Sequence, residues 1–389
     1  MGLEKMHKAS NRFFELDVFR GIAAFAVVLY HYTTWYDVNY KHSSELHFYF
    51  PLGHQGVELF FLISGFVMLL TLERTKTSLD FMVGRFSRLY PPYWAAIILT
   101  FTVVKITQLP IKPSVSFGEA LFNLTMLQGF FKIPHVDGVY WTLTVELCFY
   151  ITMFVVYRAK LLKYIEVIAT GWFVIALCYS LTSYAFHWGW FSGMNPEVHY
   201  ASISQVSVDY PLMTTGFGNH YSGLIKIFGN LLVTILVLKF AHLFIAGMML
   251  YREKQQGFSA YRWLLIGACV LKQRVAYSWE NSWQTTLIVA GCILLFYLAL
   301  QGYLRFINLK PLIFMGTISY SLYLTHQNIG YALIRMLYQY NFNPYISIFL
   351  AICISILLAT TMTFFVEQPA MNFIRGQYKK RALVEKSTS

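Results

Sequence analysis

Long runs of apolar residues recur along this chain and constrain its fold more than any other feature. Several of them approach or exceed about 20 residues, the length that a helix needs to cross a bilayer. Of the 389 residues, 57% are hydrophobic and 12% are charged, against about 25% charged residues in soluble domains. The sequence therefore predicts an all-α protein, a polytopic membrane helix bundle.

Basic residues cluster just outside the apolar runs and set the expected orientation. Lys and Arg outnumber Asp and Glu by 30 to 18, but this distribution follows the positive-inside rule and does not indicate nucleic acid. Residues 1–15 are expected to be a basic cytoplasmic N-terminus, 16–369 the membrane domain, and 370–389 a basic cytoplasmic tail. About ten spans with both termini in the cytoplasm result. They are expected near 16–36, 53–72, 92–106, 141–158, 164–186, 224–251, 260–271, 284–303, 312–334 and 345–366.

Some details of these spans are expected to be irregular. Pro91 and Pro92 suit the first turn of the third span. Lys239 and His242 interrupt the run 224–251, whose first half is then expected at the outer surface. The five cysteines lie in apolar segments without a C-x-x-C pair, which indicates packing residues and no metal site.

The apolar run 16–32 carries Arg20 near its start and His31 well inside it. An eleven-residue spacing in a helix places these side chains roughly 16 Å apart and within about 20° of one face. Ionisable groups at such depth are costly and normally face a protein interior or a wet cavity. The spacing therefore predicts that this face is one wall of an active site.

Other ionisable residues are expected to converge with His31 in the outer half of the membrane. His54 and Glu58 begin the second span, and Glu146 lies about one and a half turns into the fourth. His326 is expected roughly 21 Å from the cytoplasmic side. Carboxylates at such depth are rarely unpaired, so this cluster is expected to be functional.

Three arginines are expected at the opposite, cytoplasmic mouth. Arg20 begins the first span, and Arg85 and Arg88 share one helical face just before the third. Guanidinium forks suit phosphate oxygens. A site with cations at one mouth and histidines and carboxylates deeper inside is polarised across the membrane.

Most of these residues also have an ordinary structural explanation. His54 and His326 can hydrogen-bond between helices, and Arg20 can pair with Asp17 at i, i+3. The other two arginines can be plain positive-inside residues. Ser64, in an SGF triplet, is more often a small packing residue.

Six motifs, in order from residue 16 to residue 369, resemble the membrane acyltransferase-3 family. They are LDVFRGIAAFAVVLYH, GVELFFLISGF, F-x-x-x-R-x-x-R-x-x-P-x-x-W, WTLTVELCFY, SYSLYLTH and the terminal VEQP. The resemblance covers nearly the whole chain. It implies an inner-membrane enzyme of about ten helices that moves an acyl group, commonly acetyl, from cytoplasmic acyl-CoA to a hydroxyl of an envelope, secreted or lipid-linked carbohydrate.

The family's functional motifs can be placed on this chain. Its Arg/Lys-x10-His motif falls on Arg20 and His31, and its R-x-x-R motif on Arg85 and Arg88. Glu58 stands where many members have aspartate. The resemblance implies acyl-CoA as the donor substrate, and membrane lipids and a glycan acceptor as partners. Neither a metal nor a nucleic acid is implied.

The residues and the resemblance together predict a mechanism. Arg85 and Arg88, helped by Arg20, bind the phosphates of coenzyme A. His31 acts as general base on the acceptor hydroxyl, or forms an acyl-histidine, and Glu146 orients it. Further residues expected on the acceptor side or in support are His54, Glu58, Ser64, Trp141, Ser319, Tyr320 and His326.

A transporter or flippase is the alternative. His31, Glu146 and His326 would then form a proton relay within the membrane. Transporters often contain internal repeats and helices broken at the midplane, and the sequence contains no such repeat. The paired arginines before a proline-started helix favour a phosphate-bearing donor, and thus the enzyme.

Overall fold

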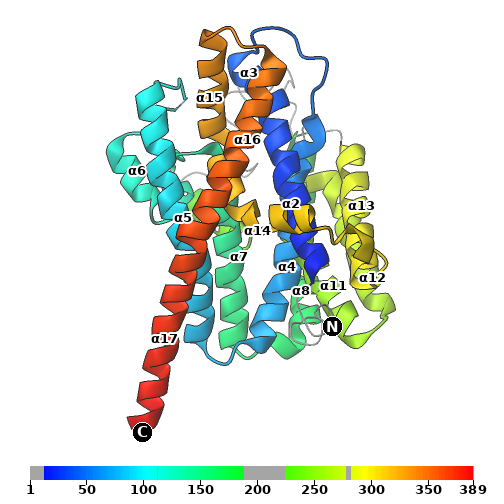
Figure 1. Ribbon diagram of the computed structural model, residues 1–389. Helices are drawn as coiled ribbons and strands as arrows, with labels where there is room; N and C mark the ends of the chain where they lie inside the picture. Colours follow the sequence, from blue (N-terminus) through cyan, green and yellow to red (C-terminus); the bar gives the residue numbers. More distant parts are fainter. Residues whose placement is uncertain (1–12, 112, 188–223, 277–281, 389) are drawn as a thin grey trace.

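The computed structural model describes residues 13–111, 113–187, 224–276 and 282–388, which form a bundle of helices without a strand (Figure 1). The α-helices are α2 (Phe14–Leu29), α3 (Tyr36–Tyr40), α4 (Gly56–Arg74), α5 (Ser78–Thr107), α6 (Phe117–Asn123), α7 (Trp141–Arg158), α8 (Ile165–His187), α10 (Leu224–Ile235), α11 (Ala241–Gln256), α12 (Ala260–Ala276), α13 (Ser282–Leu300), α14 (Lys310–Thr325), α15 (Gln327–Gln339), α16 (Pro344–Met362) and α17 (Gln368–Thr388). The short helices are the π-helices η1 (Tyr30–Trp35) and η8 (Thr363–Glu367), and the 3₁₀ turns η2 (Pro51–Gln55), η3 (Gln128–Phe131), η4 (Gly138–Tyr140), η5 (Leu162–Tyr164) and η7 (Arg305–Ile307). The all-α prediction is confirmed for these residues.

Within the described residues, six helical segments are long and apolar enough to cross a membrane. They match the second, third, fourth, fifth, eighth and tenth expected spans, and the chain is a multi-pass membrane protein. The other four expected spans fall on helices that are shorter, broken or more polar. The full number of ten, and the cytoplasmic position of both termini, stay predictions.

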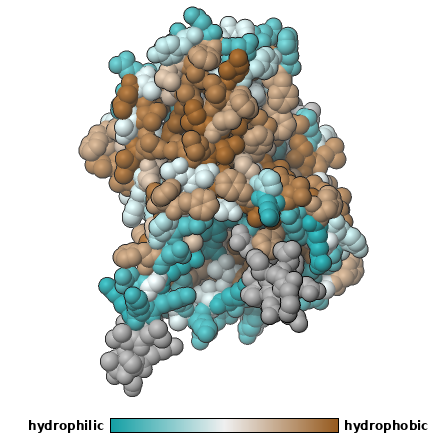
Figure 2. Space-filling model, viewed as in Figure 1, coloured by the Kyte–Doolittle hydropathy of each residue, from teal (hydrophilic) through white to brown (hydrophobic). Residues whose placement is uncertain are grey.

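Large apolar side chains point outward from the spanning helices. Ile98, Val167, Leu287 and Leu357 are between 65% and 70% exposed. Figure 2 shows a broad apolar band across the upper part of one face and hydrophilic side chains toward its lower end. Lipid tails solvate such a band, because they are as apolar as the side chains.

The expectation that Pro91 and Pro92 begin a helix is wrong. Both lie inside α5, which runs without interruption from Ser78 to Thr107. Prolines inside membrane helices are tolerated where neighbouring side chains satisfy the freed backbone groups. The prolines free the carbonyls of Ser87 and Arg88 from their i→i−4 hydrogen bonds, and at the next residue the hydroxyl of Tyr320, from α14, donates to the carbonyl of Leu89 at 3.0 Å.

The interruption expected near Lys239 separates α10 from α11. Between these helices the chain forms turns, with Val237 in the left-handed region at φ 45°. The carbonyls at 235, 236 and 239 accept hydrogen bonds from Thr152, Trp172 and Lys272, at 3.1, 2.7 and 3.2 Å. Irregular backbone at membrane depth persists only when such partners exist.

Glycines let the central helices touch at two crossings. A Cβ on Gly316 of α14 would lie 1.9 Å from the Asp17 carbonyl oxygen of α2, and one on Gly247 of α11 would lie 2.0 Å from the Leu62 carbonyl oxygen of α4. Small residues at such crossings bring backbones close together in membranes. The first crossing places α2, which carries Arg20, directly against α14, which carries Ser319 and Tyr320.

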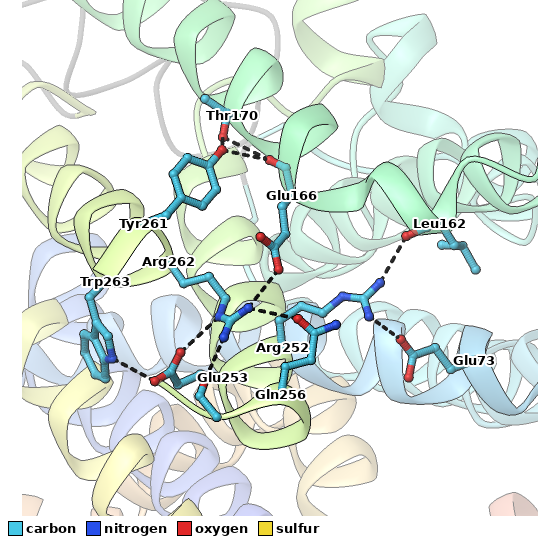
Figure 3. Close-up of polar contacts among 11 residues, drawn as sticks. Glu73, Leu162, Glu166, Thr170, Arg252, Glu253, Gln256, Tyr261, Arg262 and Trp263 are labelled. Atoms are coloured by element: carbon cyan, nitrogen blue, oxygen red, sulfur yellow. Dashed lines mark hydrogen bonds and ion pairs between the residues drawn. The ribbon is translucent and has the colours of Figure 1, made fainter. Parts of the chain in front are cut away.

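A cluster of ion pairs joins four helices at one end of the bundle (Figure 3). Arg262 of α12 contacts Glu253 of α11 at 3.0 Å and Glu166 of α8 at 3.1 Å. Arg252 of α11 contacts Glu73 of α4 at 3.0 Å. We refer to these five residues as the Arg262 cluster.

Candidate active site

A cavity of about 270 Å³ opens between α2, α4, α5, α7 and α14. It is bordered by one or more residues from each of the motifs on these helices. The polar residues that line it are Asp17, Arg20, Ser64, Arg85, Arg88, Thr142, Glu146, Tyr150, Ser319, Tyr320 and Tyr323. All three predicted donor-binding arginines are therefore brought together in one cavity.

Arg85 is held firmly by its neighbours. Its Nη2 donates to Thr71 Oγ1 at 2.7 Å, and its guanidinium lies over the ring of Tyr150, 4.7 Å from the centroid. The side chain is buried. Cation–π and hydrogen-bond contacts of this kind fix the fork in one orientation.

Arg20 and Arg88 differ from Arg85, because neither makes a hydrogen bond within the described part of the chain. Both interact electrostatically with the carboxylates of Glu146 and Glu367. Glu367 ends η8 and accepts a hydrogen bond from Ser321 at 2.9 Å. The two guanidinium forks thus keep their donors for a ligand in the cavity, and an anion with several oxygens is the ligand that they match.

Glu146 is not the partner of His31. Its Oε1 accepts hydrogen bonds from Ser64 Oγ, at 3.0 Å, and from the hydroxyl of Tyr150 on the next turn of α7. The carboxylate lines the same cavity as the arginines and does not join the histidines. The cluster of ionisable residues expected around His31 therefore lacks Glu146. The carboxylate lies with the arginines, whose positive charges attract it.

The contact that His31 makes instead is with His326. His31 Nδ1 and His326 Nε2 lie 3.2 Å apart, with ring centroids at 4.9 Å. His326 is fully buried, while His31 is partly exposed. Of the three residues of the alternative proton relay, the structure joins these two and leaves Glu146 apart.

The surroundings of the two histidines determine which nitrogen carries each proton. His326 Nδ1 faces the carbonyls of Leu322 and Tyr323 at 3.1 and 2.9 Å, so it must be protonated and its Nε2 must carry a lone pair. His31 Nδ1 faces that lone pair and the Val27 carbonyl at 2.9 Å, so it is the protonated nitrogen. His31 Nε2 then holds the lone pair that a general base needs.

His31 also lies in an unusual helix. The π-helix η1, Tyr30–Trp35, continues directly from α2 and leads into α3. Single turns of π-helix are frequent at functional sites. The other π-helix of the described chain contains Glu367.

The remaining predicted residues occupy different positions. Ser319 and Tyr320 line the cavity, whereas Trp141 packs against the ring of Phe240 at 5.4 Å. His54 uses both ring nitrogens in η2, at 2.6 Å from the Pro51 carbonyl oxygen and 2.9 Å from Gln55 Nε2. Glu58 is buried in the first turn of α4.

Tyr323 connects the cavity with the histidines. Its hydroxyl bonds to Thr142 Oγ1 at 2.9 Å, and its ring lies 5.8 Å from the His326 ring and 5.7 Å from the Phe60 ring. Tyr323 and Phe60 both line the cavity. They form its wall on the side of the histidine pair.

Sequence reasoning missed Tyr150, Tyr323 and Glu367. Tyr150 could have been found, because it follows Glu146 by four residues and so lies on the same helical face. Tyr323 and Glu367 lie inside the quoted motifs, but only tertiary contacts assign them to the site.

Comparison with known proteins assigns the chain to a family. A family model described as "Acyltransferase domain", that of the acyltransferase-3 family, matches residues 13–364. The chain belongs to this family. It is similar to "Nodulation protein 10" of Rhizobium leguminosarum bv. viciae, 29% identical over 174 residues, which are 39% of this chain and 46% of that protein. The chain thus matches less than half of that relative's length. No solved structure matches.

The chain is thus a multi-pass membrane protein that contains an acyltransferase-3 domain. The matched range contains Arg20, His31, Arg85, Arg88 and Glu146. The resemblance drawn from the six motifs is thereby confirmed. The identities of donor and acceptor rest on the site itself.

Proposed function

We propose that this enzyme transfers an acyl group, most simply acetyl, from cytoplasmic acyl-CoA to a hydroxyl of an envelope, secreted or lipid-linked carbohydrate at the inner membrane. The observation that carries the proposal is the pair of guanidinium forks of Arg20 and Arg88 in the cavity, which make no hydrogen bond to any described residue. They offer bidentate donors to phosphate oxygens of coenzyme A. Arg85 adds a fixed positive charge beside them.

The acyl group then meets the histidine pair. The thioester enters the cavity with its carbonyl toward Tyr323 and the histidines beyond it. His31 Nε2 takes the proton from the acceptor hydroxyl as that oxygen attacks the thioester carbonyl. The tetrahedral intermediate collapses, the C–S bond breaks, and the imidazolium returns the proton to the leaving thiolate. The products are an ester and free coenzyme A.

Glu146 has a different part in this proposal from the one expected. With Ser64 and Tyr150 it forms a hydrogen-bonded group between the arginines. Its negative charge reduces the electrostatic repulsion between the guanidinium groups before the donor binds. His326 takes over the orienting part and fixes the tautomer of His31.

Turnover of acetyl-CoA by the purified protein tests the proposal. We expect His31→Ala to bind acetyl-CoA normally and to lose about 10²–10⁴-fold in turnover, the usual contribution of a general base. An Arg20→Ala/Arg88→Ala variant should fail to bind the donor. If wild-type protein neither binds nor consumes acetyl-CoA, the donor is another molecule and the proposal is wrong.

A further inference from the structure

A break in the backbone at His326 separates α14 from α15. In a continuous helix each N–H donates to the carbonyl four residues earlier, so the N–H of Asn328 would donate to the carbonyl of Leu324. Here that N–H donates to Oδ2 of Asp137 at 3.0 Å, and that carbonyl accepts a hydrogen bond from the hydroxyl of Tyr140 at 3.0 Å. Side chains from one other segment thus pair both members of the interrupted hydrogen bond.

Asp137 is itself held by the turn that it begins. It directly precedes η4, and its Oδ1 accepts a hydrogen bond from the N–H of Val139 at 3.3 Å. Asn328 Nδ2 donates to the carbonyl of Val136 at 3.0 Å, which is a second contact between the same two segments. Asp137 is fully buried. A carboxylate suits this position, because it accepts hydrogen bonds at both oxygens and donates none.

The break also determines the surroundings of the His326 ring. In a continuous helix the carbonyl of Tyr323 would accept from the N–H of Gln327. Here it faces Nδ1 of His326 at 2.9 Å, and this nitrogen must therefore carry the proton. His326 Nε2 then accepts a hydrogen bond from His31 Nδ1 at 3.2 Å. A closed helix would return the Tyr323 carbonyl to the backbone.

We propose that Asp137 is a positioning residue for acyl transfer: it holds the break between α14 and α15 open and so leaves the carbonyl of Tyr323 to His326. Through His326 it sets the tautomer in which His31 Nε2 carries the lone pair of a general base. The inference rests on the proposed function. Asp137 is not among the described residues that line the cavity, so its loss should lower the rate of transfer and leave donor binding unchanged.

The test uses membranes that contain the full-length protein and acetyl-CoA labelled in the acetyl group. The readouts are the maximal rate of ester formation per enzyme molecule and the KM for acetyl-CoA. Asp137→Leu removes both acceptor oxygens at similar size, whereas Asp137→Asn keeps one of them for the N–H of Asn328. We expect Asp137→Leu to lower the maximal rate at least about tenfold, within the range of a disturbed general base, with the KM unchanged. Asp137→Asn should recover most of that loss.

The decisive comparison repeats Asp137→Leu in protein that already carries His326→Ala. Two residues that act through one shared contact are not additive. We therefore expect Asp137→Leu to lower the rate by less than about twofold in this background. The same loss in both backgrounds would mean that Asp137 supports the fold in general, and would overturn the proposal.

A milder variant tests the other side of the break. Tyr140→Phe removes only the hydroxyl on the Leu324 carbonyl and should lower the maximal rate severalfold with the KM unchanged. Tyr93→Phe is the matched control, because Tyr93 is equally buried, its ring lies 5.2 Å from that of Tyr140, and its hydroxyl donates to the carbonyl of Asn123 at 2.9 Å. It should form ester at the wild-type rate.

Equal rates in Tyr140→Phe and Tyr93→Phe would show that the break does not depend on these partners, which also overturns the proposal. Wild-type membranes that form no ester would remove the proposed function and this inference with it. Ester formation in wild type together with additive losses would remove the inference alone.

Discussion

At the scale of single residues, the tautomer of His31 is the most specific property of the site. Nδ1 of His31 donates toward His326 Nε2 at 3.2 Å, and His326 in turn is fixed by two backbone carbonyls. His326 is thus a positioning residue, since it does not reach a substrate itself. Its effect on the tautomer of His31 depends on a hydrogen-bond acceptor at the position of His326 Nε2.

The first prediction concerns that atom. Glutamine can place its Oε1 near the position of a histidine Nε2 and still accept the hydrogen bond. We expect His326→Gln to keep acetyl transfer within about tenfold of wild type, and His326→Ala to lose roughly a hundredfold, within the range of a disturbed general base. Steady-state transfer rates check this. Equal losses in both variants would show that the acceptor atom does not matter.

The second prediction separates the three arginines. Arg85 is already bonded to Thr71 and stacked on Tyr150, whereas Arg20 and Arg88 line the cavity without a hydrogen bond to any residue that the structure describes. A hydrogen bond to a charged group contributes about 1.5–3 kcal/mol. We therefore expect Arg88→Ala to raise the KM for acetyl-CoA about 10–100-fold.

The control for Arg88 is the donor without one phosphate. Arg88→Ala should discriminate less between acetyl-CoA and acetyl-dephospho-CoA than wild type, whereas Thr71→Val, which only loosens Arg85, should keep the discrimination. Loss of donor binding in Thr71→Val with normal binding in Arg88→Ala would reverse the assignment.

Residue types and spacing predicted which residues belong to the site better than they predicted which side chains contact each other. Arg20, Arg85 and Arg88 line one cavity, as their spacing and the motifs indicated. The pairing of Glu146 with His31 was wrong, because depth along a span does not fix the direction in which a side chain points. Glu146 faces Ser64 on the neighbouring helix, a contact that no sequence pattern predicts.

At the scale of helices, the crossing of α2 and α14 brings the motifs together. Gly316 faces the backbone of α2 at Asp17, and Gly21 faces the backbone of α14 at Met315 and Gly316. Arg20 precedes Gly21, and Tyr320 lies one turn beyond Gly316. The helices must touch at the glycines for the cavity and the histidine contact to form together.

The third prediction follows from this crossing. A methyl group on Gly316 would lie 1.9 Å from the Asp17 carbonyl oxygen, so the helices must move apart. We expect Gly316→Ala to destabilise the protein by about 1–3 kcal/mol, the usual cost of overpacking, and to lower transfer as well. Gly171→Ala in α8 is the matched control, because nothing lies within 4 Å of its added Cβ. Thermal unfolding in detergent compares them, and equal stability would contradict the crossing.

Helix irregularities were the part of the architecture least visible in the sequence. The two prolines of α5 suggested a helix start, but α5 continues through them, where the Tyr320 hydroxyl of α14 binds the neighbouring Leu89 carbonyl. The π-helix around His31 leaves no signature in composition. Both depend on partners from distant segments, and hydrophobic periodicity contains no such information.

At the scale of the whole molecule, the length of the apolar runs predicted the class of protein correctly. Six of the expected spans are apolar helices of sufficient length. The remaining expected spans contain polar or broken helices, such as α14 and α15, which meet at His326. Hydropathy detects α4, α5 and α7, which line the cavity, but it does not detect α2 and α14, which line the cavity with them.

The last prediction concerns what holds the distant helices in place. The Arg262 cluster joins α4, α8, α11 and α12 (Figure 3), and its central pair is buried, with side chains of Arg262 and Glu253 only 6% and 5% exposed. Glu253 also accepts a hydrogen bond from Trp263 Nε1 at 3.0 Å. Removing the arginine would leave two carboxylates close together, one of them buried.

We therefore expect Arg262→Met to destabilise the protein by about 3–5 kcal/mol, as when one partner of a buried ion pair is lost. The exposed pair Lys41–Asp37, at 3.9 Å with the lysine side chain 76% exposed, gives the control. Lys41→Met should change stability by less than about 1 kcal/mol. Adding Glu253→Gln to Arg262→Met should recover part of the loss, because the unpaired buried charge disappears. Equal effects of Arg262→Met and Lys41→Met on thermal unfolding would show that the cluster does not hold these four helices together.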